Sequence, residues 1–283
     1  MKSVTRKRCL LALVMLFAVS ACFAQWGGRG RGWGHRRTIT PEEYRRRNDF
    51  PEWRNADGFE KDTFTFARVQ YTSSDWRRDA WQIDFPDSDM NFSLRLQQLT
   101  SMKVNPNPVI VQLTDDNLFD YPFLYMIEPG SIQLMQEEVE GLRRYCLNGG
   151  FMMVDDFWGD YEYANFRDEI MRVFPNREIG ELDLSHEIFH NVYDLKEKPQ
   201  IPSMRWIYDR TYTWERDKGP GARNVHFRAI KDDADRIMVL ICHNTDLGDG
   251  WEKEGVDRDY FETYSVKKAY PMGINIVTYA MTH

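Results

Sequence analysis

The sequence predicts an α/β fold built on a mostly parallel sheet with helices on both faces. Residues 151–154 and 237–241 are apolar at every position, as strands covered on both faces must be. Segments with helical periodicity alternate with such strands along the chain, and this alternation is typical of a parallel sheet. With 283 residues, the chain could hold one large α/β domain or two small ones.

The first strands and helices are expected where periodicity changes along residues 62–130. Residues 64–71 alternate apolar and polar side chains, which indicates a strand. Residues 91–100 repeat apolar side chains at helical spacing. Residues 109–113 form an apolar run bounded by prolines, and residues 123–127 form another, so both are predicted strands.

The clearest helix covers residues 135–147. Val139, Leu142 and Cys146 share one face there, and Gly149 follows where a helix commonly ends. By the same patterns, the remaining elements are strands at 151–155, 225–230 and 236–242 and helices at 163–173 and 270–281.

The N-terminus has the pattern of an export signal. A basic opening is followed by an apolar run over residues 9–21, and Ala24 offers a small residue for cleavage, which predicts a signal peptide over residues 1–24. Residues 19–22 also resemble a bacterial lipobox. That alternative ends the signal at Ala21 and anchors the chain through lipid on Cys22, the one membrane contact expected. Both alternatives predict an exported protein, either periplasmic or a membrane-anchored lipoprotein.

A linker is expected between the signal and the globular domain, over residues 25–61. Residues 26–37 are rich in glycine and arginine and lack apolar periodicity, which is typical of a disordered tether. Thr40 before Pro41 has the pattern of a helix start, so a short helix is expected over residues 41–47. The globular domain then covers residues 62–283.

Charge and cysteine content exclude several classes of function. The formal charge is −7, although residues 26–47 carry seven arginines, so the rest of the chain is strongly acidic and nucleic acid is not an expected partner. Cys146 and Cys242 are the cysteines of the globular domain. They could pair in an oxidising compartment or remain buried as small apolar side chains. The chain has no Cys-x-x-Cys motif, and no cofactor is expected.

Several strings resemble a bacterial family known as domain of unknown function 4159. They lie between residues 62 and 283 and begin Phe64-Thr65-Phe66-Ala67-Arg68, Leu118-Phe119-Asp120-Tyr121, Asn148-Gly149-Gly150-Phe151, Asp155-Asp156-Phe157-Trp158, Ile241-Cys242-His243-Asn244 and Tyr270-Pro271-Met272-Gly273. The resemblance implies a class I glutamine-amidotransferase-like fold, which is a flavodoxin-like three-layer sandwich.

One departure from active amidotransferases matters for function. The resemblance implies a cysteine nucleophile on a strand-to-helix turn, with His and Glu supplied later. Here that turn carries Asp155 and Asp156, while Cys146 precedes the strand and Cys242 lies within another. The Cys-His-Glu triad is therefore absent from the expected places, and a pseudoenzyme with respect to thiol chemistry is predicted.

Asp155 and Asp156 are the first candidate catalytic residues. They end a buried strand, and ligands of open α/β sheets bind beyond the carboxyl ends of strands. Adjacent residues of an extended strand point to opposite sides, so both can face one ligand only if the strand has already turned. Acid/base catalysis or metal ligation competes with a plain capping and turn role.

A second polar cluster follows the strand at residues 236–242. His243 is a candidate proton carrier, and Asp246 and Asp249 could bind a ligand or a cation. Their spacing does not fit an EF-hand, and an ordinary turn is the alternative. Asn244 and Trp251, in the same cluster, are further candidate ligand contacts.

Carboxylates next to aromatic residues suggest sugar recognition, because rings stack on sugar faces while acids bind hydroxyl groups. The further candidates of this kind are Asp120, Tyr121, Trp158 and Asp160. His186 and His190 match the His-Glu-x-x-His zinc pattern, but they lie in a short segment with no evident third ligand, so surface or packing roles compete with a metal site. No metal ligand set is assigned.

We therefore expect an exported domain that binds a small polar or carbohydrate-like ligand at the strand carboxyl edge. One alternative is a hydrolase using Asp155 or Asp156 with His243, with or without a divalent cation. Another is a non-catalytic module of cell-envelope assembly. The sequence does not decide whether the protein is an enzyme, and it names no protein partner.

Overall fold

The computed structural model describes residues 39–58, 62–73 and 80–283. The predicted signal, the lipid anchor at Cys22 and the tether at residues 26–37 lie outside these ranges and remain predictions. Within the described ranges, no helix combines the length and apolar character that crossing a membrane would require.

The described residues form one seven-stranded sheet with the order β2-β1-β3-β4-β7-β6-β5. The first five strands in that order run parallel to one another, and β6 and β5 are antiparallel to the strand beside them. The strands are β1 (Ala67–Gln70), β2 (Val109–Gln112), β3 (Phe123–Ile127), β4 (Phe151–Phe157), β5 (Gly180–Glu181), β6 (His226–Lys231) and β7 (Ile237–His243). The predicted α/β class with a mostly parallel sheet is confirmed.

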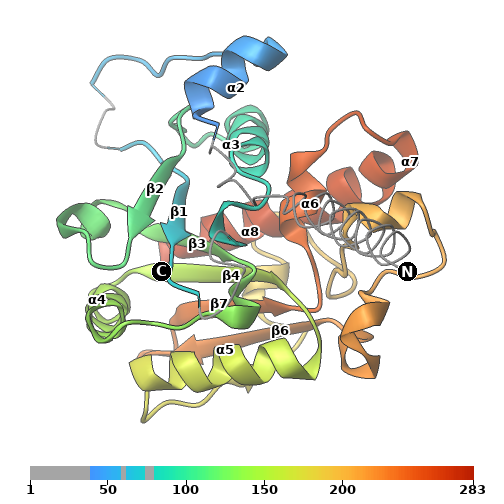
Figure 1. Ribbon diagram of the computed structural model, residues 1–283. Helices are drawn as coiled ribbons and strands as arrows, with labels where there is room; N and C mark the ends of the chain where they lie inside the picture. Colours follow the sequence, from blue (N-terminus) through green and yellow to red (C-terminus); the bar gives the residue numbers. More distant parts are fainter. Residues whose placement is uncertain (1–38, 59–61, 74–79) are drawn as a thin grey trace, which may run out of the picture. The chain divides into compact units, whose positions relative to one another are not determined.

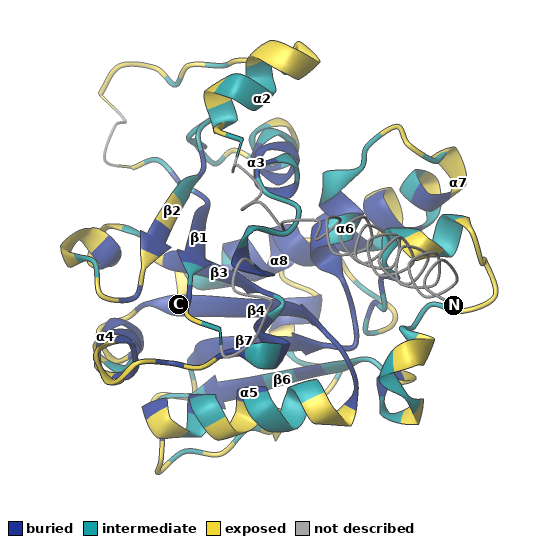
Figure 2. Ribbon diagram, viewed as in Figure 1, coloured by how far each residue is buried: buried dark blue, intermediate teal, exposed yellow. Residues whose placement is uncertain are grey.

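Helices cover both faces of this sheet (Figure 1). The main ones are α3 (Asp87–Leu99), α4 (Gln136–Leu147), α5 (Gly159–Val173), α6 (Leu247–Glu252) and α8 (Tyr270–Thr282). Apolar side chains of α3, α6 and α8 join one buried cluster, and those of α4 and α5 join another. Because strand side chains alternate, Tyr125 packs into the first cluster while Met126 packs into the second. The central strands are therefore buried on both faces (Figure 2).

The smaller elements connect or extend these layers. They are α2 (Pro41–Asn48), α7 (Arg258–Tyr260), the π-helix η8 (Phe261–Ala269) that leads into α8, and the short 3-10 helices η1 (Ala80–Gln82), η2 (Asp116–Asp120), η3 (Pro129–Ser131), η4 (Glu187–Phe189), η5 (Met204–Ile207), η6 (Arg216–Lys218) and η7 (Pro220–Ala222). Thr40 caps α2 by accepting a hydrogen bond from the Glu43 N–H, as its sequence pattern predicts.

The ends of some helices and strands differ from the predicted ones where polar residues are part of the helix or strand. β4 extends two residues beyond the expected end, because Asp156 adopts a left-handed conformation (φ 54°) and shifts the register with β7. α5 begins at Gly159, four residues earlier than expected, and the Trp158 N–H ahead of it donates to Glu162. The sequence patterns did not predict α6, a short helix with two glycines that Asp246 caps.

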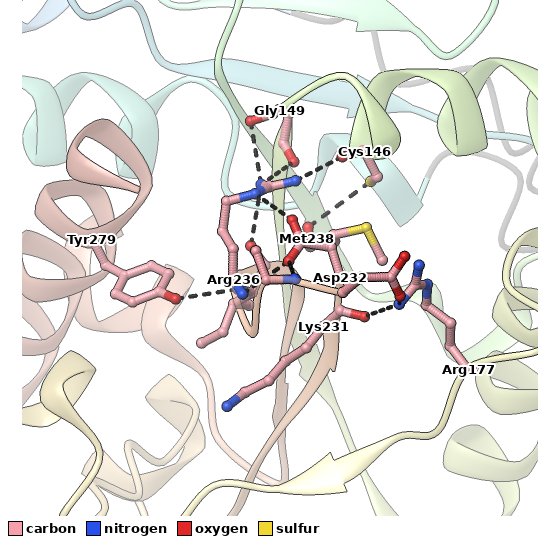
Figure 3. A network of polar contacts seen from close by, with 12 residues as sticks. Cys146, Gly149, Arg177, Lys231, Asp232, Arg236, Met238 and Tyr279 are labelled. Carbon is pink, nitrogen blue, oxygen red and sulfur yellow. Dashed lines mark hydrogen bonds and ion pairs between the residues drawn. The ribbon is translucent and has the colours of Figure 1, made fainter.

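Arg236 fastens the amino edge of the sheet (Figure 3). Its guanidinium donates to the Cys146 carbonyl over 2.8 Å, to the Gly150 carbonyl over 3.1 Å and to Asp232 over 2.9 Å. The N–H that begins β7 donates to the Tyr279 hydroxyl of α8 over 3.1 Å. These bonds join α4, the turn between β6 and β7, and α8, so the polar groups at this edge support the fold.

Cys146 and Cys242 are both buried and unpaired. Cys146 packs in the cluster under α4 and α5, whereas Cys242 packs in the cluster under α3, α6 and α8. The sheet therefore separates the two thiols, and the alternative of small buried apolar side chains is the one that the structure supports.

Candidate functional site

A cavity of about 220 Å³ opens at the carboxyl edge of the sheet, and we call it the carboxylate cavity. It is lined by the end of β4, by residues that follow β1, β3, β4 and β7, and by part of the segment 203–218. Its acidic lining residues are Asp84, Glu128, Asp156, Glu162, Glu215, Asp246 and Asp249. The cavity lies beyond the carboxyl ends of the strands, where open α/β sheets bind their ligands.

Asp155 and Asp156 reach the site in different ways. The left-handed conformation of Asp156 turns its carboxylate into the cavity, where the Trp158 indole N–H donates to it over 2.8 Å. Asp155 is fully buried, and it accepts hydrogen bonds of 3.0 Å from the Tyr125 hydroxyl and the Gly248 N–H. The strand has indeed turned between them, so Asp156 lines the cavity and Asp155 ties β4 to α6.

Burial governs the protonation of both groups. It raises the pKa of Asp155 to about 7, against the opposing effect of the hydrogen bonds from Tyr125 and Gly248. Burial, followed by the charge of Glu128, raises the pKa of Asp156 well above its ordinary value. A carboxyl group with a raised pKa is a common feature of acid/base sites.

Asp246 and Asp249 enter from the start of α6. Asp246 caps the helix by accepting a 2.7 Å hydrogen bond from the Asp249 N–H, and only 2% of its surface is exposed. Asp249 accepts a 2.6 Å hydrogen bond from the Met204 N–H. Burial and the charge of Asp156 raise the pKa of Asp246. The turn alternative is thus correct for Asp246, but the same turn also places both carboxylates in the cavity.

Asp84, which the sequence patterns did not single out, completes the inner lining. It lies in the connection from β1 to α3 with a left-handed backbone (φ 62°). Its Oδ2 atom is sealed from solvent and has no hydrogen-bond partner within the described ranges. One oxygen each of Asp84, Asp249 and Glu252 lies within 4.8 Å of the others. Burial, then the charge of Asp249, raises the pKa of Asp84.

The fully buried Arg68 of β1 positions the Asp84 segment. Its guanidinium donates to the carbonyls of Trp81 over 3.0 Å and Ile83 over 2.8 Å. It also forms a two-point ion pair with the buried Asp89. Because Asp89 is its direct partner, Arg68 holds the loop in place and offsets the charge of Asp84 only in part.

Cations at the rim of the cavity have partners as well. Lys218 forms an ion pair with Glu162, and Arg205 forms one of 2.7 Å with Glu215. The inner carboxylates therefore face the cavity without a matching positive side chain among its lining residues. Burying a carboxylate without compensation is costly, so the site favours protonation or a bound cation.

His243 does not line the carboxylate cavity. Its Nδ1 accepts a 3.0 Å hydrogen bond from Arg228, and its Nε2–H donates to the Gly159 carbonyl over 3.1 Å. Burial, assisted by the charge of Arg228, lowers the pKa of His243 to about 3. A neutral imidazole with both nitrogens engaged supports the turn before α5, and this geometry does not bring it to Asp155 or Asp156 as the hydrolase hypothesis requires.

Asn244 also organises that turn. Its side chain accepts from the Gly159 N–H over 2.8 Å and donates to the carbonyls of Gly221 and Asn224. Gly159 has a positive φ of 76°, and a Cβ added there would lie 2.5 Å from the Lys218 carbonyl oxygen. Only glycine fits this position without rearrangement. Asn244 holds this tight turn through its hydrogen bonds and does not line the cavity, so it acts as a positioning residue.

Four other residues that the sequence suggested as ligand contacts do not line the carboxylate cavity. Asp120 and Tyr121 precede β3 and therefore lie at the opposite, amino edge of the sheet. Trp251 is 1% exposed and packs in the core with its ring centre 4.5 Å from that of Phe92. Asp160 is exposed in the first turn of α5 and is not among the lining residues.

The zinc pattern at His186 and His190 does not form a helical face. His186 precedes the single turn η4 and accepts a hydrogen bond from the Ile188 N–H. The His190 ring bonds to Asp194 over 2.7 Å and to the Leu184 carbonyl over 2.6 Å. The two histidines thus stabilise local turns, which agrees with the surface or packing role and not with a shared metal site.

A second cavity of about 220 Å³ lies beside the first, and we call it the aromatic cavity. The two cavities share Ser203, Arg205 and Glu215. The rings that line the aromatic cavity belong to Trp206, Tyr212 and Trp214. No sequence pattern singled out these rings, because their segment has few regular elements and carries no periodic signal.

These features define a mixed α/β protein with a mostly parallel seven-stranded sheet, in the described ranges, and an acidic cavity at its carboxyl edge. The chain belongs to the family described as a domain of unknown function (DUF4159), whose sequence profile matches residues 65–281. The resemblance found in the sequence is thereby confirmed at the level of the family. A comparison with curated proteins found no match.

Proposed function

We propose that this domain is an exported binding module for a small polar or carbohydrate-like ligand. The observation that carries the proposal is the contact between two different cavities, one lined by carboxylates and one lined by aromatic rings. Carboxylates accept hydrogen bonds from hydroxyl groups, while flat rings stack on the apolar faces of sugars. A ligand of one or a few sugar units would use both cavities together.

The strand order supports a flavodoxin-like fold of the class I glutamine-amidotransferase-like type. Counted in chain order, the five parallel strands follow the order 2-1-3-4-5 of flavodoxin-like sheets. Such folds bind ligands outside the strand carboxyl ends. The basic and apolar opening of the sequence supports export, by either a signal peptide or a lipoprotein signal.

Thiol catalysis has no support in this domain. Burial raises the pKa of Cys146 and that of Cys242 above the ordinary range, so neither thiol provides a thiolate near neutral pH. Neither sulfur lines the carboxylate cavity.

Calorimetric titration with sugars and cell-wall fragments tests the proposal. We expect a sugar-containing ligand to bind, and we expect Trp214→Ala and Asp156→Asn each to weaken that binding at least tenfold, about 1.4 kcal/mol. Tyr161→Ala is the matched control, because Tyr161 is an aromatic residue that is 85% exposed on α5 and outside both cavities. Failure of every sugar and fragment to bind would reject the proposal in favour of an envelope assembly module.

A hydrolase is the second candidate, because Asp156 is a buried carboxyl group in the cavity. It would act with another cavity carboxylate such as Asp246, since His243 is engaged elsewhere. Chromatography of bound fragments after incubation distinguishes the two functions. Cleavage by the native chain that Asp156→Asn abolishes would support hydrolysis, whereas recovery of the intact fragment supports binding alone.

A further inference from the structure

We propose that Asp84, Asp249 and Glu252 hold a divalent cation next to the carboxylate cavity, which Asp84 and Asp249 line. The proposal goes beyond sugar binding and does not depend on it. Its geometric basis is the approach of three carboxylate oxygens, one from each residue, to within 4.8 Å of one another. Atoms that share one cation as ligands must approach one another in this way, because each lies about 2–2.6 Å from the ion.

A buried oxygen of Asp84 without a hydrogen bond provides a second, independent observation. The Oδ2 atom of Asp84 is closed off from solvent and accepts no hydrogen bond from the described part of the chain. Buried polar atoms nearly always have a partner, so this oxygen points to a missing one.

Charge balance favours an ion with two positive charges. When a cation displaces their protons, the three carboxylates carry three negative charges, and Lys253 forms an ion pair with Glu252. One ammonium group against three carboxylates leaves two negative charges. The nearby Arg68 offsets only part of this excess, because its guanidinium lowers the pKa of Asp84 but is already paired with Asp89.

The donor atoms indicate which ions would bind. All three side chains offer oxygen, and oxygen-only sites suit Ca²⁺, Mg²⁺ or Mn²⁺ better than zinc or copper. The Met204 N–H donates to one oxygen of Asp249 and so helps to hold this side chain in place. Asp156 and Asp246 line the same cavity and could accept hydrogen bonds from water on the ion.

The test is calorimetric titration of the full chain, freed of metals with EDTA, with each of CaCl₂, MgCl₂ and MnCl₂ in the absence of any organic ligand. We expect at least one ion to bind with one-to-one stoichiometry and to raise the melting temperature. Dissociation constants on the order of 10⁻⁴–10⁻³ M are typical of extracellular calcium modules. Because no sugar is present, this result is independent of the sugar titration.

Asp84→Asn is the decisive variant, because asparagine tolerates the left-handed backbone of this position. We expect ion affinity to fall at least tenfold in Asp84→Asn and in Asp249→Asn. Asp168→Asn, which removes an exposed carboxylate of α5, should bind as tightly as the native chain. The proposal is overturned if no ion binds the native chain, or if all three variants bind with equal affinity.

Discussion

Replacing Arg68 with methionine tests how the fold holds its site together. Arg68 and its partner Asp89 are both fully buried, and the guanidinium also bonds to the carbonyls of Trp81 and Ile83. Arg68→Met fills much of the same volume but leaves the Asp89 carboxylate without its cation. It also releases the segment that carries Asp84.

Removing one partner of a buried ion pair typically costs about 3–5 kcal/mol. For a domain of this size, each kcal/mol lowers the melting temperature by about 2–4 °C. We therefore expect a loss of roughly 6–20 °C for Arg68→Met. Arg68→Lys should lose less, because it keeps the charge but not the planar fork that reaches Asp89 and both carbonyls.

Urea unfolding followed by circular dichroism measures these free energies. Arg167→Met is the control, since Arg167 forms an exposed ion pair with Asp168 and should unfold at the native urea midpoint. A loss below about 1 kcal/mol for Arg68→Met would show that the buried pair does not support the fold, and the reasoning about the Asp84 segment would be refuted.

Three further predictions concern the turn before α5 and the buried thiols. Gly159→Ala should destabilise the domain by more than about 1 kcal/mol in urea, because of its positive φ and the 2.5 Å approach to the Lys218 carbonyl; a native midpoint would contradict this. Folding lowers the pKa of His243 from 6.5 to about 3, so its contribution is complete above pH 6.5 and is lost as pH falls towards 3. His243→Gln should therefore flatten the dependence of unfolding free energy on pH between 6 and 4, and an unchanged slope would refute the assignment. Cys146 and Cys242 should react with a thiol reagent only after denaturant is added, whereas fast labelling of the native domain would contradict their burial.

Periodicity predicted the parts of the fold that apolar burial determines. β3 occupies the expected residues 123–127, because a short unbroken apolar run between turns is typical of a strand covered on both faces. The end of β4 was predicted less well, since the left-handed conformation of Asp156 depends on its neighbours in space. α6 gave little periodic signal, because it has six residues and two are glycines.

The residues of the candidate site also differ in how well the sequence predicted them. Asp156, Asp246 and Asp249 were singled out because they lie at or just after the ends of predicted strands, and they do line the cavity. The same reasoning would also have singled out Glu128, which directly follows β3. Asp84 could not be predicted in this way, because the distant Arg68 fixes its segment through tertiary hydrogen bonds.

His243 illustrates the limit of grouping polar residues by sequence alone. It follows a strand as the acidic residues do, but its ring centre lies 4.9 Å from that of Tyr163 of α5. The alternation of side chains along β7 places His243 on the same face as Ile241, which packs in the cluster under α4 and α5. Strict alternation would have separated it from Asp155, which shares a face of β4 with Met153 of the other cluster.

The most direct test of the acidic site is anomalous X-ray diffraction from a crystal of the native domain soaked in MnCl₂. The account predicts one strong manganese peak among Asp84, Asp249 and Glu252, with oxygen atoms roughly 2.0–2.6 Å away. A map with no peak there, or with these side chains turned away from one another, would contradict it.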